Sequence, residues 1–271
     1  MQPLPPPKYS ILPAYLPIGT RRRGIPLAAP GPDPLKARFL VAHDTGNPGS
    51  TAAGNVRYYT DTYRTATPAS AHLFVDDRQI LECVPAITGS PEKAWHVLYD
   101  RREDNILYGC NANDAAIGVE YCYGGTINAD EAYRRYMWLL AYLCVKFELD
   151  PRRDITGHCF LDPGRKTDPV SGLLQSRRSF SQLLADVVDT FRVIGGELPD
   201  APPLPATVTA QGLLNIRTGE PFRRAPVARQ APAGEVLAVL GQVTGEAVNG
   251  NDAWYLLSPG NQYCWSGAVR P

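Results

Sequence analysis

The sequence has no net charge, no cysteine motif and no long apolar run, and each absence excludes a class of protein. Its 27 basic residues balance its 27 acidic residues, so no overall field draws the chain to nucleic acid or to an anionic membrane. The six cysteines are scattered without a CxxC pair, which argues against a disulfide scaffold and a zinc finger. No stretch approaches the roughly 18 apolar residues of a membrane span. We therefore expect recognition through a local site.

The first 36 residues contain many prolines and the run "RRRG", without a sustained helical or strand period. They are predicted to form an irregular lead-in over residues 1–36. The order of a signal peptide, a charged segment followed by an apolar one, is not recognisable here. We expect synthesis in the cytoplasm, with no cleaved leader.

Residues 37–195 mix short apolar runs with amphipathic segments. This pattern predicts one α/β or α+β domain, in which a central mixed sheet is flanked by helices. We expect strands in 38–44 and 116–125, a hairpin in 70–85, and helices in 50–64, 130–151 and 179–196.

The composition changes after this domain. Residues 196–206 form a Pro-rich linker, and residues 207–271 contain only short strand-like runs separated by Gly, Pro and Asn. The sequence therefore predicts a second, small all-β barrel over 207–271.

Two of the four histidines follow predicted strands. His43 and His158 each end an apolar run, so their imidazoles are expected at the same edge of one sheet. A catalytic zinc site needs three N, O or S ligands and one open position. Asp168 can return on a Gly- and Pro-rich loop to supply the third ligand, with Asp162 and Cys159 as rivals.

Five segments taken together resemble a known family. They are "FLVAHDTGN", "SAHLFVDD", "AWHV", "GCNANDAAIGVEYC" and "GHCFLDPGRKTDP". In this order they are similar to the zinc-dependent N-acetylmuramoyl-L-alanine amidases, which are related to phage lysozyme-type amidases and peptidoglycan recognition proteins. The resemblance covers residues 37–195. It implies that peptidoglycan is the partner and that the amide between N-acetylmuramic acid and the first L-alanine of the stem peptide is cleaved.

The resemblance also implies roles for individual residues. His43, His158 and Asp168 match the family's zinc ligands, Glu120 its catalytic glutamate and Lys166 its catalytic lysine. Glutamate suits a general base that becomes a general acid, and an ammonium suits the stabilisation of an oxyanion. From the strand alternation alone, a solvent-facing position is the favoured interpretation of Glu120.

His72, Trp95 and His96 match segments that lie near the metal pocket or the substrate groove of the family, so they are predicted to bind substrate. For Trp95, a place in the core is an equal alternative.

The C-terminal part resembles the bacterial SH3-type modules of wall hydrolases, through "GLLNIRTG", "AWYLL" and "YCWSGAV". The resemblance implies a cell-wall targeting domain. The expected protein is a monomeric amidase that acts on the cell wall, outside the cytoplasm. Two alternatives are a non-catalytic recognition protein, and the same activity used as a phage lysin or a secreted antibacterial toxin.

Overall fold

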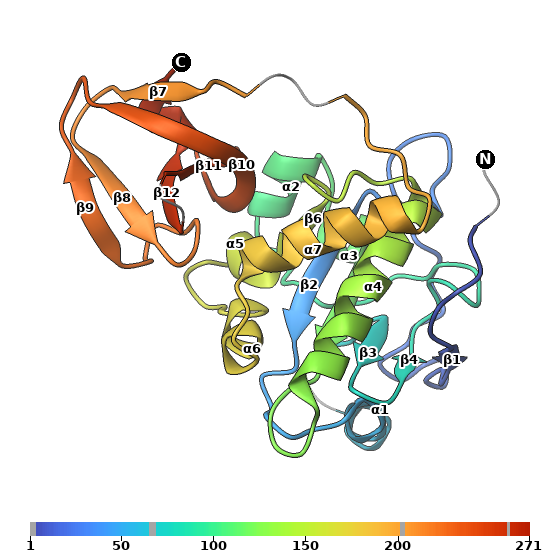
Figure 1. Cartoon of the computed structure of the whole chain (residues 1–271). Helices are drawn as coiled ribbons and strands as arrows, with labels where there is room; N and C mark the ends of the chain where they lie inside the picture. Colours follow the sequence, from blue (N-terminus) through green and yellow to red (C-terminus); the bar gives the residue numbers. More distant parts are fainter. Residues whose placement is uncertain (1–3, 65–68, 201–203, 259–260) are drawn as a thin grey trace.

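A computed structural model describes residues 4–64, 69–200, 204–258 and 261–271 (Figure 1). The larger, N-terminal unit contains a six-stranded mixed sheet with the order β1-β4-β3-β5-β2-β6. Its elements are β1 (Ile11–Pro13), β2 (Phe39–Asp44), α1 (Ala52–Asp61), β3 (Leu73–Val75), β4 (Ile80–Glu82), α2 (Glu103–Tyr108), α3 (Ala112–Ala115), β5 (Ala116–Tyr121), α4 (Ala129–Phe147), β6 (Ile155–Gly157), α5 (His158–Leu161), α6 (Val170–Gln175) and α7 (Phe180–Val193).

The centre of this sheet is parallel and buried. Strand β2 lies between β5 and β6, pairs in parallel with both, and is buried along all six residues. A parallel strand covered on both faces is expected to be continuously apolar, as "FLVA" is. In this register His43 stands directly beside Glu120.

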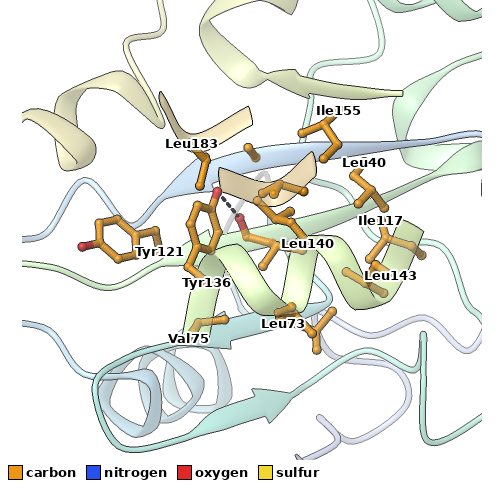
Figure 2. Close-up of a cluster of buried hydrophobic side chains, with 14 of the residues drawn as sticks. Leu40, Leu73, Val75, Ile117, Tyr121, Tyr136, Leu140, Leu143, Ile155 and Leu183 are labelled. Atoms are coloured by element: carbon orange, nitrogen blue, oxygen red, sulfur yellow. Dashed lines mark hydrogen bonds between the residues drawn. The ribbon is translucent and has the colours of Figure 1, made fainter. Parts of the chain in front are cut away.

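One face of the sheet is covered by α4 and α7, which lie side by side in Figure 1. Figure 2 shows Leu40 and Ile117 of the strands near Leu140 and Leu143 of α4, and Tyr121 beside Tyr136. Helix α4 starts where the Asn128 side chain accepts a hydrogen bond from the Glu131 backbone N–H. The opposite face presents Phe39 and Val41 to a second cluster, and His43 and Glu120 continue this face toward the strand ends.

The C-terminal unit is a curled, seven-stranded antiparallel sheet with the order β13-β7-β10-β11-β12-β8-β9. Its apolar core includes Ile216, Leu257 and Cys264. Its elements are β7 (Thr207–Ala210), β8 (Leu214–Thr218), β9 (Val227–Ala231), β10 (Val236–Val248), β11 (Asn251–Leu257), β12 (Gln262–Trp265), the 3-10 turn η1 (Ser266–Ala268) and β13 (Val269–Arg270).

The loop 219–226, between β8 and β9, joins the two units. Phe222 is only 7% exposed and belongs to the main core cluster of the larger unit, with its ring centroid 5.7 Å from that of Phe160. One carboxylate oxygen of Glu220 accepts the Phe180 backbone N–H at 3.0 Å, at the start of α7. Arg224 Nη2 donates to the Lys166 carbonyl oxygen at 2.5 Å. The smaller unit thus packs directly behind the loop that follows β6.

The structure confirms the expected fold class: a mixed sheet flanked by helices, followed by an antiparallel sheet. Two details differ from the expectation. The lead-in contributes β1, which pairs in parallel with β4 at the sheet edge. His158, expected at the end of an apolar run, begins the short helix α5 directly after β6. No helix in the described parts of the chain has the length and apolar character to span a membrane.

Candidate metal and catalytic site

Four elements bring the predicted site residues to one edge of the sheet. His43 is the penultimate residue of β2, Glu120 its neighbour on β5, and His158 the first residue after β6. The chain then turns through 162–167 and returns, so that the Asp168 carbonyl oxygen accepts the Cys159 backbone N–H at 2.8 Å. Residues far apart in sequence meet here because β2, β5 and β6 run in parallel.

His43, His158 and Asp168 form a buried cluster. The Nδ1 atoms of His43 and His158 lie 2.9 Å and 3.1 Å from the same Asp168 oxygen, Oδ2. One potential ligand atom from each residue lies within 4.8 Å of the other two. The buried Nε2 atom of His158 has no hydrogen-bond partner among the described residues. Two imidazoles and one carboxylate in this arrangement could hold a metal ion.

The protonation states in the cluster suit a cation. Burial lowers the pKa of His43 to about 4, which favours the neutral imidazole that a metal requires. Burial alone would raise the pKa of Asp168, but its hydrogen bonds with His158 and His43 outweigh this and hold the pKa below its ordinary value. The cluster therefore presents a neutral His43 imidazole and an ionised Asp168 carboxylate.

The two rival ligands lie elsewhere. Asp162 is almost fully buried and pairs with Arg165 Nη2 at 2.7 Å and with Arg101 Nη1 at 3.7 Å. Cys159 is buried, and burial raises the pKa of its thiol well above the ordinary value. Neither side chain belongs to the His43, His158 and Asp168 cluster.

The cluster opens into a cavity of about 320 Å³, which Glu120 and Lys166 also line. Glu120 is half-buried, and its enclosed Oε2 atom has no partner among the described residues. Burial, together with the negative charges of Asp168 and Asp44, raises its pKa well above the ordinary value. The Lys166 ammonium lies 3.7 Å from Asp168 Oδ1. Glu120 thus faces the cavity, and the solvent-facing alternative is not what the structure shows.

His96 lies directly behind His43. The His96 Nδ1 atom is 3.0 Å from His43 Nε2. When the His43 ring carries its proton on Nε2 and its Nδ1 lone pair is free, this Nε2–H can donate to His96 Nδ1. Gly118 makes room for this ring, since a Cβ atom there would lie 2.8 Å from two His96 ring atoms. The Asn113 side chain accepts the His96 backbone N–H at 2.8 Å. His96 also lines the cavity and can contact a bound molecule.

His72 occupies a different position from the one expected of a substrate-binding residue. It is fully buried, its Nδ1 accepts the Gly118 backbone N–H at 3.0 Å, and its Nε2 donates to the Glu92 carbonyl oxygen at 2.9 Å. Burial lowers its pKa to about 4, so the ring stays neutral. Both ring nitrogens are used by the backbone, and His72 supports the strand beside His96.

Trp95 lines a second cavity, of about 420 Å³, which shares His96, His158 and Lys166 with the first. The Arg23 guanidinium stacks over the Trp95 ring at 4.4 Å from its centroid. Trp95 thus forms part of a cavity wall next to the cluster.

Sequence reasoning missed two residues near the site. Asp44 Oδ2 accepts hydrogen bonds from the Ser171 hydroxyl at 2.6 Å and the Gly172 backbone N–H at 2.7 Å, and so ties β2 to the end of the Asp168 loop. Its position directly after His43 is the only signal that the sequence offers. Arg23 comes from the "RRRG" run, and no local pattern indicates that this run reaches the site.

Comparison with known proteins assigns the family. The family model described as N-acetylmuramoyl-L-alanine amidase matches residues 33–171, a segment that contains His43, Glu120, His158, Lys166 and Asp168. The chain belongs to the N-acetylmuramoyl-L-alanine amidase family.

Individual proteins are similar to parts of the chain. The amidase CwlA of Bacillus subtilis (strain 168) is 33% identical over 94 residues, which cover 34% of this chain and 28% of CwlA. The chain thus matches under a third of that relative's length. The Staphylococcus aureus hydrolase AmiA, whose crystal structure contains its ligand, is 21% identical, with 70% of this chain and 86% of that chain covered and a TM-score of 0.52. A mutant endolysin from Bacillus subtilis is 22% identical over 66% of this chain and 99% of that chain, with a TM-score of 0.47. The likeness to AmiA supports the fold.

Proposed function

We propose that the protein is a zinc-dependent N-acetylmuramoyl-L-alanine amidase that hydrolyses the amide between N-acetylmuramic acid and the L-alanine of the peptidoglycan stem peptide. The observation that carries the proposal is the convergence of His43, His158 and Asp168 with Glu120 in one cavity, within a chain of this family.

Zinc fits the donor set better than harder cations do. Two neutral imidazoles with one carboxylate are a typical catalytic zinc set, whereas Mg²⁺ and Ca²⁺ prefer oxygen ligands. The three donors come from a buried cluster that is held by β2, β6 and the returning loop. Bound there, zinc would lower the pKa of a water molecule toward neutrality and polarise the scissile carbonyl.

The chain's own residues supply the remaining steps. Glu120 takes the proton of the attacking water on its enclosed carboxylate and passes it to the leaving amide nitrogen. Because burial raises the pKa of Glu120, its carboxylate is a stronger base for the first of these transfers. The Lys166 ammonium donates to the oxyanion that develops on the carbonyl oxygen. With a metal bound at Nδ1, His43 would donate its Nε2–H to His96 Nδ1, which would fix the orientation of the ring.

Among the three predicted substrate-binding residues, we assign direct contact to Trp95 and His96, which line the cavities. His72 acts through the backbone that it supports.

For residues 207–271 we propose an SH3-like domain that binds the cell wall and raises the local substrate concentration. The curled antiparallel sheet supports this assignment. The proposed site of action is the cell wall.

The test is mass spectrometry of the products that purified protein forms from isolated peptidoglycan. Stem peptides with a free N-terminal alanine, without new reducing sugar ends, are expected. A chelator should abolish their release and added zinc should restore it. Binding to the wall without any product would contradict the proposal and favour a recognition protein.

A further inference from the structure

The N-terminal run Arg21–Arg22–Arg23 is held rigidly beside the metal cluster, although it lies outside the segment that matches the family model. Arg21 is buried and donates to the carbonyl oxygens of Ala69 and Thr62, at 2.6 Å and 3.0 Å. Arg22 makes a two-pronged ion pair with Glu92, at 2.8 Å and 2.6 Å. Two of the three arginines therefore anchor the segment.

Arg23 is held in place by these neighbours but makes no ion pair with a described residue. Its guanidinium stacks over Trp95 and lines the 420 Å³ cavity. Arg165 and Lys166 line the same cavity, and none of its described lining residues is acidic. Arg165 is neutralised by Asp162, and Lys166 lies near Asp168. Arg23 is thus an exposed cation, stacked on Trp95, whose charge no described acid balances.

A cation in this position favours an anionic ligand, because its fork of N–H donors matches a carboxylate and remains available while the guanidinium stacks on Trp95. The proposed substrate has negative charge on only one side of the scissile bond. The lactyl carboxyl group is consumed in the amide, and the N-acetylated sugar is neutral. The nearest free carboxylates belong to the stem peptide beyond the first alanine.

Resting on the function proposed above, we infer that the cavity lined by Arg23 and Trp95 receives the stem peptide, and that Arg23 binds the first free carboxylate after the scissile alanine. The cavity on the other side of His96 and His158, which contains Asp44, Glu120 and Asp168 and shares Arg165 and Lys166 with the first, then faces the muramoyl group. The enzyme discriminates between stem peptides in which this carboxylate is free and those in which it is amidated.

The test uses two soluble muramoyl peptides that differ only in a carboxylate or a carboxamide at the second stem residue. The wild type should cleave the carboxylate form with the higher kcat/KM. Arg23→Gln should lower kcat/KM for that form about tenfold, the effect of losing one charge-assisted hydrogen bond, and change it less than about twofold for the amide form. Arg57→Gln is the matched control, since the Arg57 side chain is 85% exposed on α1 and, among the described residues, forms an ion pair with Asp61 alone.

An equal effect of Arg23→Gln on both peptides, or no effect on either, would overturn the inference while leaving the proposed activity intact. The activity itself fails if the wild type cleaves neither peptide. If neither peptide is cleaved, a binding measurement still tests the inference about Arg23. Both peptides are titrated into Glu120→Gln and into the double variant Glu120→Gln/Arg23→Gln. The double variant should bind the carboxylate form about tenfold more weakly than Glu120→Gln does. The two variants should bind the amide form equally well. Zinc content should be equal in all variants.

Discussion

Phe222→Ala tests whether the two units stabilise each other in solution. Phe222 belongs to the C-terminal unit but is buried in the core of the larger one, against Phe160. Truncation of a buried Phe costs about 3–5 kcal/mol. Because Phe222 retains 7% exposure at the edge of the cluster, the expected loss is near the lower limit, about 3 kcal/mol. This corresponds to a fall in Tm of about 6–12 °C.

The assay is urea unfolding followed by near- and far-ultraviolet circular dichroism. In the wild type the two signals should change together, and in Phe222→Ala they should separate as the units lose their coupling. Leu240→Ala is the control, since Leu240 lies on β10 and is 58% exposed, so a change within about 0.5 kcal/mol is expected. If Phe222→Ala cost no more than this control, the packing argument would be refuted. The variant should also lose activity on soluble muropeptides, because Phe160 lies in the same short helix as His158.

Three further predictions concern individual carboxylates. Asp168→Ala should lose most bound zinc, as measured by elemental analysis, and a protein with full zinc content would contradict its assignment as a ligand. Glu120→Gln should keep zinc but lose at least about 100-fold in kcat, since general acid–base catalysis contributes this much or more; retained turnover would assign the proton transfer to another group. Burial raises the pKa of Glu220 from 4.5 to about 7. Between these two pH values the folded protein therefore holds a proton on Glu220 that the unfolded chain has lost. The free energy of unfolding should fall by about 3 kcal/mol as the pH rises from about 4.5 to 7. Glu220→Gln, which keeps the acceptor for the Phe180 N–H, should flatten this slope in urea titrations, and an unchanged slope would exclude Glu220 as its source.

The long elements were predictable because their periods extend over many residues. The apolar stripe of α4 and the continuous apolar run of β2 each identify the element and its buried side. His43 and Glu120 meet because β2 and β5 pair in parallel, so that both residues lie at one edge of the sheet. No local pattern in the sequence indicates that these two strands are neighbours. The packing of α4 on β2 and the pairing of His43 with Glu120 both depend on the same buried sheet.

Other features depend on tertiary contacts that leave no local trace. Helix α5 has four residues, too few to show a period. Strand β1 forms because β4 offers an edge, although its own residues include a proline. The ring of His72 was expected near substrate, but both of its nitrogens are used by backbone groups distant in sequence. Arg23 reaches the site only through anchors provided by Arg21 and Arg22.

The loop 219–226 limits how this chain can be redesigned. A C-terminal unit of different binding specificity could not simply be fused after α7, because the replacement would remove the Phe222 contact of Phe160 and the Arg224 donor of the Lys166 carbonyl. A working chimaera would have to carry this loop along with the catalytic part. The boundary for domain exchange therefore runs through the β-sheet unit, and not through the proline-rich segment that precedes it.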